Sequence, residues 1–162
     1  TMCCTALPRA LAATTRTSTA RWLPALWSAP TTPTLCTPNH PEHTDVNNCT
    51  YMNKGVVIKT HAGQKYTSDG MSVAAARELA ARAGVPLQYF ANRSDKVGGS
   101  TLGNLQSHTL PIPMADIGCA QFAMHSAVET ASVADAEAMT KAVAAFYRVH
   151  LRALGDGTYT LE

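Results

Sequence analysis

The chain has 162 residues, of which 46% are hydrophobic and 15% charged, a balance typical of one globular domain rather than a disordered protein. Thirteen Lys and Arg residues against eleven Asp and Glu give a net charge of +2, which favours neither a nucleic-acid partner nor an anionic membrane. No apolar run reaches the ~18 residues that a membrane-spanning helix needs.

Five cysteines, an odd number without regular spacing, do not form a disulfide framework. Cys3 and Cys4 are adjacent and therefore cannot form a CxxC metal-binding turn. A reducing compartment is therefore expected, and we predict a cytoplasmic protein.

Residues 1–37 differ in composition from the rest of the chain. No acidic residue precedes Glu42, and repeated prolines interrupt any helix. An acid-free start containing Arg and Ser is typical of an organelle transit peptide, although an unstructured leader has the same composition. Composition changes abruptly at Pro38, so we expect the ordered domain to span 38–162.

Two elements are predicted after Gly55. The short β-branched segment Val56–Lys59 indicates a strand, and Gln64–Tyr66 is expected to continue its hairpin partner. A helix is expected over Val73–Arg82, with Ser72 as its N-cap and Gly84 as its end.

The middle of the chain alternates strand and helix. Leu87–Ala91 predicts a strand, and Gly98–Thr101 predicts a turn that leads into a helix ending near Ser107. Ile112–Ile117 is expected to form a third strand. The glycine pair either binds an anion or forms a tight turn with close backbone packing, and the turn is favoured.

The last predicted helix is the clearest. Ser132 and Asp135 resemble a capping box, and apolar residues recur at helical spacing as far as Leu154, ahead of Gly155. Alternating strands and helices indicate an α/β fold with a mixed sheet flanked by helices.

His125 is the candidate site residue because an apolar run and a strand lead to it. A lone histidine beside Phe122 and Met124 is more often a core residue than a ligand. Its position after a strand and a short loop is nevertheless one from which side chains of open α/β sheets reach a cleft. Arg93 and Asp95 are expected to form an ion pair that holds the glycine turn.

Five stretches in this order and spacing resemble the C-terminal part of the aspartyl-aminopeptidase family of dizinc metallopeptidases. They are Val56–Lys59, Gln64–Tyr66, Asn92–Asp95, Gly98–Asn104 and Asp116–Ser126.

The resemblance implies a fragment of a zinc-exopeptidase-like αβα domain, an enzyme that removes acidic N-terminal residues from peptides, and a homo-oligomer. It implies that Lys59 and Tyr66 contact substrate. It also implies that these two side chains and His125 surround one cleft. It further implies that His125 binds one of two zinc ions.

The other family site residues have no counterpart. A segment of the form Asp-x-Ala-His-Ala-(apolar)-His would fall on Thr31–Thr37, which carries none of those side chains. Codons for these residues permit that segment one reading frame away, so residues 1–37 are interpreted as an out-of-frame leader. The glutamate general base is also absent, so no catalytic residue is assigned.

Three functions remain open from the sequence. The first is a fragment of a zinc aminopeptidase, inactive on its own because its site is incomplete. The second is a non-catalytic remnant or oligomer-interaction module. The third is an unrelated α/β domain with a targeting leader.

Overall fold

The computed structural model describes residues 41–45, 47–110, 112–155 and 158–162, so the expected leader and its boundary at Pro38 lie outside the described residues. The elements of the described chain follow one another as η1 (Pro41–His43), β1 (Val56–Thr60), α2 (Gly70–Ala83), β2 (Leu87–Ala91), α3 (Leu102–Ser107), β3 (Ile117–Cys119), β4 (Gln121–Phe122), β5 (Thr130–Ala131), α4 (Val133–Tyr147), β6 (Leu151–Gly155) and β7 (Thr158–Leu161).

The central sheet has the strand order β2-β1-β3. β1 runs parallel to β2, with Val56 opposite Leu87, and antiparallel to β3, with Val56 opposite Cys119. The predicted α/β fold with a mixed sheet is confirmed. The first four residues of β1 are buried on both faces, which explains why this strand has no polar and apolar alternation.

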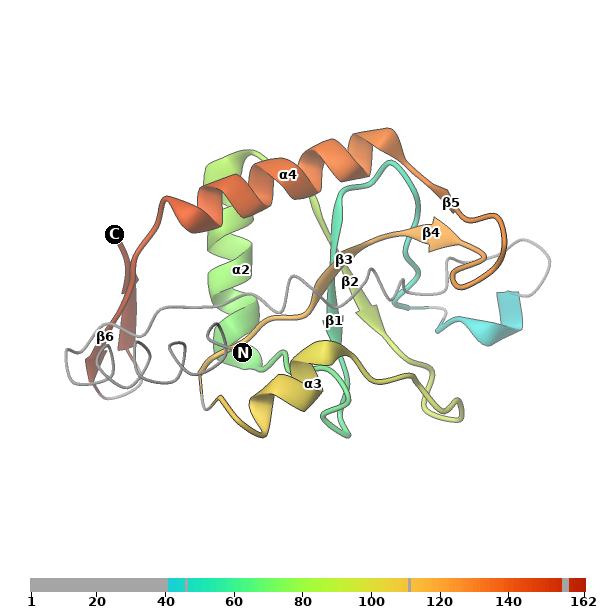
Figure 1. The fold of residues 1–162 in the computed structure, drawn as a ribbon, viewed down its shortest axis with the longest axis horizontal. Helices are drawn as coiled ribbons and strands as arrows, with labels where there is room; N and C mark the ends of the chain where they lie inside the picture. Colours follow the sequence, from blue (N-terminus) through green and yellow to red (C-terminus); the bar gives the residue numbers. More distant parts are fainter. Residues whose placement is uncertain (1–40, 46, 111, 156–157) are drawn as a thin grey trace, which may run out of the picture.

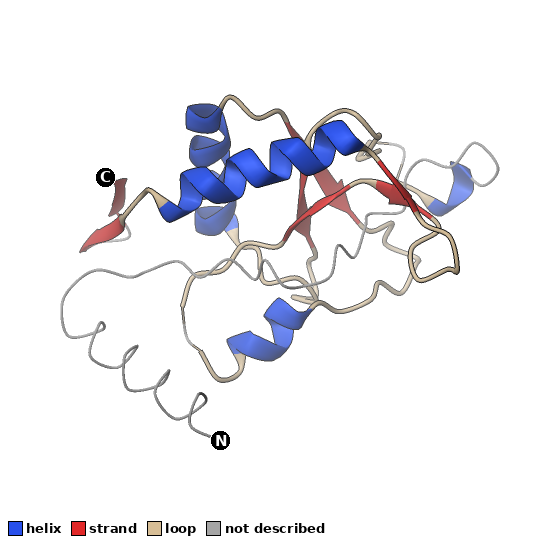
Figure 2. Cartoon of the chain, turned by 45° about the horizontal axis from the view of Figure 1, so that its top comes forward, coloured by secondary structure: helices blue, strands red, loops and turns tan. Residues whose placement is uncertain are grey.

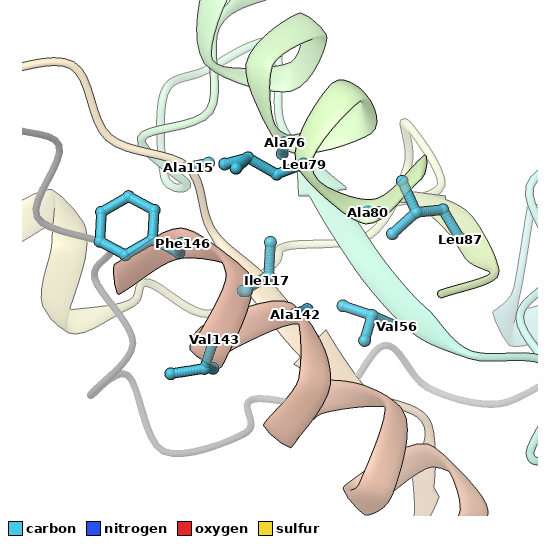
Figure 3. A pocket seen from close by; sticks show the side chains of 10 residues that line it. All are labelled: Val56, Ala76, Leu79, Ala80, Leu87, Ala115, Ile117, Ala142, Val143 and Phe146. Carbon is cyan, nitrogen blue, oxygen red and sulfur yellow. The ribbon is translucent and has the colours of Figure 1, made fainter. Parts of the chain in front are cut away.

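Helices α2 and α4 cover one face of the sheet and contact each other (Figure 1). Val56, Ala80 and Val85 form the buried centre of this layer, against which the α4 residues Ala138, Met139 and Ala142 pack. A small cavity of about 50 Å³ remains between the two helices and the strands, and Figure 3 shows that only apolar side chains line it. This layer is therefore the apolar core of the domain.

Helix α2 begins three residues earlier than the sequence predicts. Asp69, not Ser72, is its N-cap, because the Asp69 carboxylate accepts the Ser72 backbone N–H at 2.7 Å. Ser72 takes the reciprocal position, its hydroxyl accepting the Asp69 N–H at 2.8 Å. The expected end is confirmed, since Gly84 adopts the left-handed conformation with a φ of 64°.

Helix α4 begins as predicted but ends earlier. The Ser132 hydroxyl accepts the Asp135 N–H, whereas the Asp135 carboxylate does not complete a capping box. The prediction that the helix runs to Leu154 is wrong. It ends at Tyr147. Beside the helix end, His150 exchanges two backbone hydrogen bonds with Glu162, and the β6–β7 hairpin begins there (Figure 2).

Two predicted strand boundaries are also wrong. Gln64–Tyr66 forms turns rather than a strand, and the Lys65 carbonyl accepts the Thr101 N–H at 3.4 Å instead of a strand partner. The third strand begins at Ile117 rather than Ile112. One further bond joins the Lys59 N–H to the Asp116 carbonyl at 2.9 Å, and Pro113 has no N–H with which to continue the ladder. Among the described helices, none is long and apolar enough to cross a membrane.

Candidate functional site

Lys59 lies on the sheet face opposite the helices. Alternation along β1 places Val57 and Lys59 on this face, where Val57 joins Tyr66, Phe90 and Ala120 in a buried cluster. The Lys59 side chain has 0% exposure, and its Nζ lies 5.7 Å from the centre of the Tyr66 ring. Gly118 on β3 makes room for it, since a Cβ there would lie 3.2 Å from Lys59 Cε.

The charge of Lys59 is compensated by Asp116, which also has 0% exposure. Burial lowers the pKa of Lys59 to about 8, and the negative charge of Asp116 limits that fall. The Asp116 carboxylate accepts the Thr101 hydroxyl and, at 3.4 Å, the Thr67 N–H. Lys59 is therefore a buried cation held within a polar network rather than a solvated strand end.

Tyr66 links this buried network to the surface. Its side chain is 6% exposed, its ring packs near Phe90, and its hydroxyl donates to Asn92 Oδ1 at 3.4 Å. Burial raises the pKa of the Tyr66 phenol, and the negative charge of Asp116 adds to the rise. The phenol therefore keeps its proton, and its hydroxyl remains a hydrogen-bond donor.

The predicted turn at Gly98–Thr101 is wrong, since the turn of this loop lies at Ser94–Asp95, where the Lys96 N–H donates to the Arg93 carbonyl; the predicted close backbone packing is present. A Cβ on Gly98 would lie 1.8 Å from Asn92 Nδ2, so glycine allows the Asn92 side chain to approach the loop. Helix α3 after it has only six residues, too few for an anion site at its N-terminus. The expected ion pair is confirmed, with Arg93 Nε 2.7 Å from Asp95 Oδ1.

His125 lies on an exposed turn between β4 and β5. Its φ is 67° and that of Ala123 is 55°, so two non-glycine residues of this turn adopt the left-handed conformation. The Glu129 carboxylate accepts the His125 backbone N–H, and Gln121 Nε2 donates to the same carboxylate at 3.4 Å. The Ser126 N–H also donates to the Ala123 carbonyl at 3.0 Å, so the turn is held by local hydrogen bonds rather than by core packing.

Tyr66 and His125 line one cavity of about 330 Å³, which we call the His125 cavity. The loop after β2 supplies most of its remaining wall, including Asn92, Arg93 and Lys96. Lys59 is not part of the lining and lies beneath the Tyr66 ring. The structure therefore brings together two of the three predicted site residues directly and the third through Tyr66.

The donor set does not fit a zinc site. Zinc sites take three or four protein ligands, and within the described ranges no group of three His, Cys, Asp or Glu side chains could hold a metal ion. His125 is a single imidazole on an exposed turn, and its assignment as a ligand stays a prediction.

Three polar residues of this region were given no site role by sequence reasoning. They are Asp116 and Asn92, which begin two of the resembling stretches, and Glu129, and each contacts a predicted site residue or its network. Asp116 could have been identified from the sequence, because a charged residue inside an otherwise apolar run indicates a buried charge that needs a partner. The contacts of Asn92 and Glu129 depend on loop conformation, which residue type does not specify.

Most of this chain is similar in sequence to one family of known proteins. The family model described as "Aminopeptidase I zinc metalloprotease (M18)" matches residues 13–147. The match begins ahead of the expected domain boundary at Pro38, in residues whose placement the structure does not describe. The boundary stays a prediction.

Relatives and solved structures give the same family. A probable M18 family aminopeptidase 2 from Clostridium novyi is 43% identical over 112 residues, 69% of this chain and 26% of that protein. One from Mycobacterium tuberculosis H37Rv is 39% identical over 114 residues, 70% of this chain and 26% of that protein. The mApe1 dodecamer of S. cerevisiae superposes with a TM-score of 0.63 at 26% identity, over 72% of this chain and 25% of that chain. The chain thus spans about a quarter of the length of these relatives.

Proposed function

Because this chain belongs to the M18 family of aminopeptidase I zinc metalloproteases, we propose that it is a C-terminal piece of an aminopeptidase catalytic domain. The proposal rests on the His125 cavity, which is lined by Tyr66 and His125 from two different loops. Lys59 lies beneath the Tyr66 ring. Convergence of chemically capable side chains from separate elements is typical of a substrate site in an α/β fold.

In the proposed whole enzyme, Tyr66 contacts a peptide that has an acidic N-terminal residue, and the predicted role of Lys59 acts through the Tyr66 ring, because Lys59 is fully buried beneath that ring. A cation and a phenol that keeps its proton both suit a carboxylate or a carbonyl oxygen that gains negative charge. Asp116 keeps the Lys59 ammonium in place, and Asn92 fixes the direction of the Tyr66 hydroxyl. His125 would contribute one ligand to a two-zinc centre, whose other ligands are not among the described residues.

We propose that the isolated chain has no aminopeptidase activity. A two-metal mechanism needs bridging carboxylates and a carboxylate base within hydrogen-bond reach of the attacking water. Glu129 does not offer that base, since it is engaged with the His125 backbone and with Gln121. One imidazole competes poorly with water and buffer for zinc, so excess metal does not rebuild the centre.

The test is release of N-terminal Asp or Glu from short peptides by the purified chain, with and without added zinc. We expect no release, and weak zinc binding that His125→Ala barely alters. His108→Ala is the matched control, because His108 is also exposed and lies at the end of α3, away from the cavity lining. Zinc-dependent turnover that His125→Ala abolishes and His108→Ala preserves would refute the proposal.

A second candidate function is a non-catalytic oligomer-interaction module. It is favoured by the solved relative that is described as a dodecamer, and by apolar side chains that α4 leaves exposed, Val133 and Tyr147. Sedimentation velocity on the purified chain distinguishes a monomer from an assembly. Family membership removes the third alternative, an unrelated α/β domain.

Three further proposals rest on the sequence. We place the start of the ordered domain near Pro38, and limited proteolysis that left a resistant product containing Arg9, Arg16 and Arg21 would overturn this boundary. Sequencing the encoding DNA from about codon 20 to codon 40 tests the out-of-frame leader directly. From the irregular cysteine spacing we propose that the protein is located in a reducing compartment, the cytoplasm.

A further inference from the structure

The His125 cavity has a size that suits a ligand. Its volume of about 330 Å³ lies at the lower end of the ~300–1,000 Å³ typical of small-molecule sites. Phe90 and Met124 give its lining apolar surface, whereas Asp45, Arg93 and Lys96 bring charge. A ligand of this cavity therefore has both an apolar part and a charged or polar part.

Two of the three charged side chains already have partners. Arg93 Nε pairs with Asp95 at 2.7 Å, and its guanidinium also donates to the Glu42 carbonyl. Asp45 accepts the Asn47 N–H and the Asn48 amide, which together lower its carboxyl pKa, with a smaller contribution from Arg93. These contacts connect the residues at the edge of the cavity. They also compensate the charges of Arg93 and Asp45, so neither side chain is readily available to a ligand.

Lys96 is different. Its backbone N–H donates to the Arg93 carbonyl at 3.0 Å, while its side chain is exposed. Within the part of the chain that the structure describes, no hydrogen bond or ion pair involves its ammonium group. Lys65, the neighbouring lysine, instead donates its ammonium proton to the Gly98 carbonyl at 2.8 Å. Lys96 is therefore the cation of this lining that can pair with an incoming anion.

We propose that the His125 cavity binds short peptides through a carboxylate that pairs with Lys96. The proposal rests on the proposed function only in taking a peptide as the ligand. A single solvated ammonium group suits a singly charged carboxylate better than a phosphate, for which proteins generally converge several donors. Phe90 and Met124 provide apolar surface for the neighbouring part of the peptide.

A peptide carries such a carboxylate either on an acidic side chain or at its C-terminus. Three tripeptides separate these sources: Asp-Ala-Ala amide has only the side-chain carboxylate, Asn-Ala-Ala free acid has only the terminal one, and Asn-Ala-Ala amide has neither. Dissociation constants would come from NMR titrations of the purified full chain at low salt, where exposed ion pairs are least screened.

We expect at least one of the two carboxylate peptides to bind about threefold to fivefold more tightly than the neutral one, the upper part of the range for an exposed ion pair. Lys96→Met should remove this preference and Lys96→Glu should reverse it. Lys54→Met is the matched control, because Lys54 is equally exposed and lies outside the cavity lining. It should retain the preference.

Equal binding of all three peptides by the unmodified chain would overturn the inference. So would a preference that survives Lys96→Met, or one that Lys54→Met removes to the same extent, since the latter reflects net charge alone. Chromatography of the same mixtures detects hydrolysis separately. Hydrolysis would contradict the proposed inactivity without affecting the inferred binding. Loss of the carboxylate preference would contradict the inferred binding without bearing on activity.

Discussion

The two ends of the candidate site are built in opposite ways. Lys59 lies inside the sheet, fully buried, with its charge compensated by a buried carboxylate. His125 lies on an exposed turn with left-handed backbone, held by the Glu129 carboxylate and by the hydrogen bond from the Ser126 N–H to the Ala123 carbonyl. The first end is formed by the same packing that forms the domain, whereas the second is fixed by a few local polar contacts.

This difference shows which part of the site the chain can complete alone. Packing between β1, β2 and β3 fixes the position of Lys59 as soon as the sheet forms. The His125 turn has no comparable support within the described residues, since its neighbours from Met124 to Thr130 are exposed or only partly buried. A change beneath β1 should therefore affect the whole domain, and a change in the turn should remain local.

The largest effect is expected for Asp135→Ala. Asp135 is 1% exposed, and its carboxylate accepts the N–H groups of Asn53 and Gly55 at 2.8 Å each, which anchors the loop that enters β1. Losing the carboxylate leaves the buried Gly55 N–H and the partly buried Asn53 N–H without their acceptor, so the free energy of unfolding should fall by about 2 to 3 kcal/mol.

Urea denaturation measures this change. Glu137→Ala is the control, because Glu137 lies on the same helix, is exposed and pairs only with Lys141 four residues on. It should leave stability nearly unchanged. Equal midpoints for Asp135→Ala and Glu137→Ala would show that the loop before β1 does not support the buried end.

The next effect is a pH dependence caused by Lys59. The pKa of Lys59 falls from 10.5 to about 8 on folding, so between these values the unfolded chain binds more protons than the folded one. Stability should therefore rise with pH in this window. Burial raises the pKa of the Cys119 thiol above 9.0 and that of Tyr66 above 10.0, and both shifts lower stability at higher pH.

The interval from pH 8 to pH 9 is consequently the clearest, and we expect a gain of about 1 kcal/mol there. Denaturation at both pH values checks it, and Lys59→Met should abolish the gain because methionine has a similar shape and does not titrate. A gain that persists in Lys59→Met would assign it to another group and would mean that the charge of Lys59 is not buried.

The smallest effect is expected for Glu129→Ala. Without its carboxylate the His125 N–H loses its acceptor, so amide hydrogen exchange at His125 should accelerate by about tenfold or more. The free energy of unfolding should change by less than about 1 kcal/mol, because the turn is exposed. Hydrogen exchange followed by NMR gives the first quantity and urea denaturation the second.

Glu78→Ala serves as the control, since Glu78 is exposed and pairs with Arg82 on α2. It should leave exchange at His125 unchanged. If the amide of His125 exchanged at the same rate in Glu129→Ala as in Glu78→Ala, the turn would be held by something other than this carboxylate.

Local sequence signals predicted several elements correctly because those signals act over a few residues. The β-branched segment that forms β1, the strand Leu87–Ala91 and the end of α2 at Gly84 are confirmed. A glycine can adopt the left-handed conformation without steric cost, so its effect on a helix end is independent of the rest of the fold. The α/β class followed from the same alternation of strand and helix.

Other features were decided by contacts between distant residues. Leu151 and Leu154 repeat at helical spacing but lie in β6, because His150 pairs with Glu162 and Leu151 is buried against Ala75 and Ala115. The third strand pairs with β1 only from Ile117 onward in its strand register, and Lys59 is buried because Gly118 on this neighbouring strand makes room. Residue types alone thus determined the strands β1 and β2, the end of α2 and the family resemblance. Burial and the cavity required the tertiary structure, because both depend on which distant side chains exclude water from a given group.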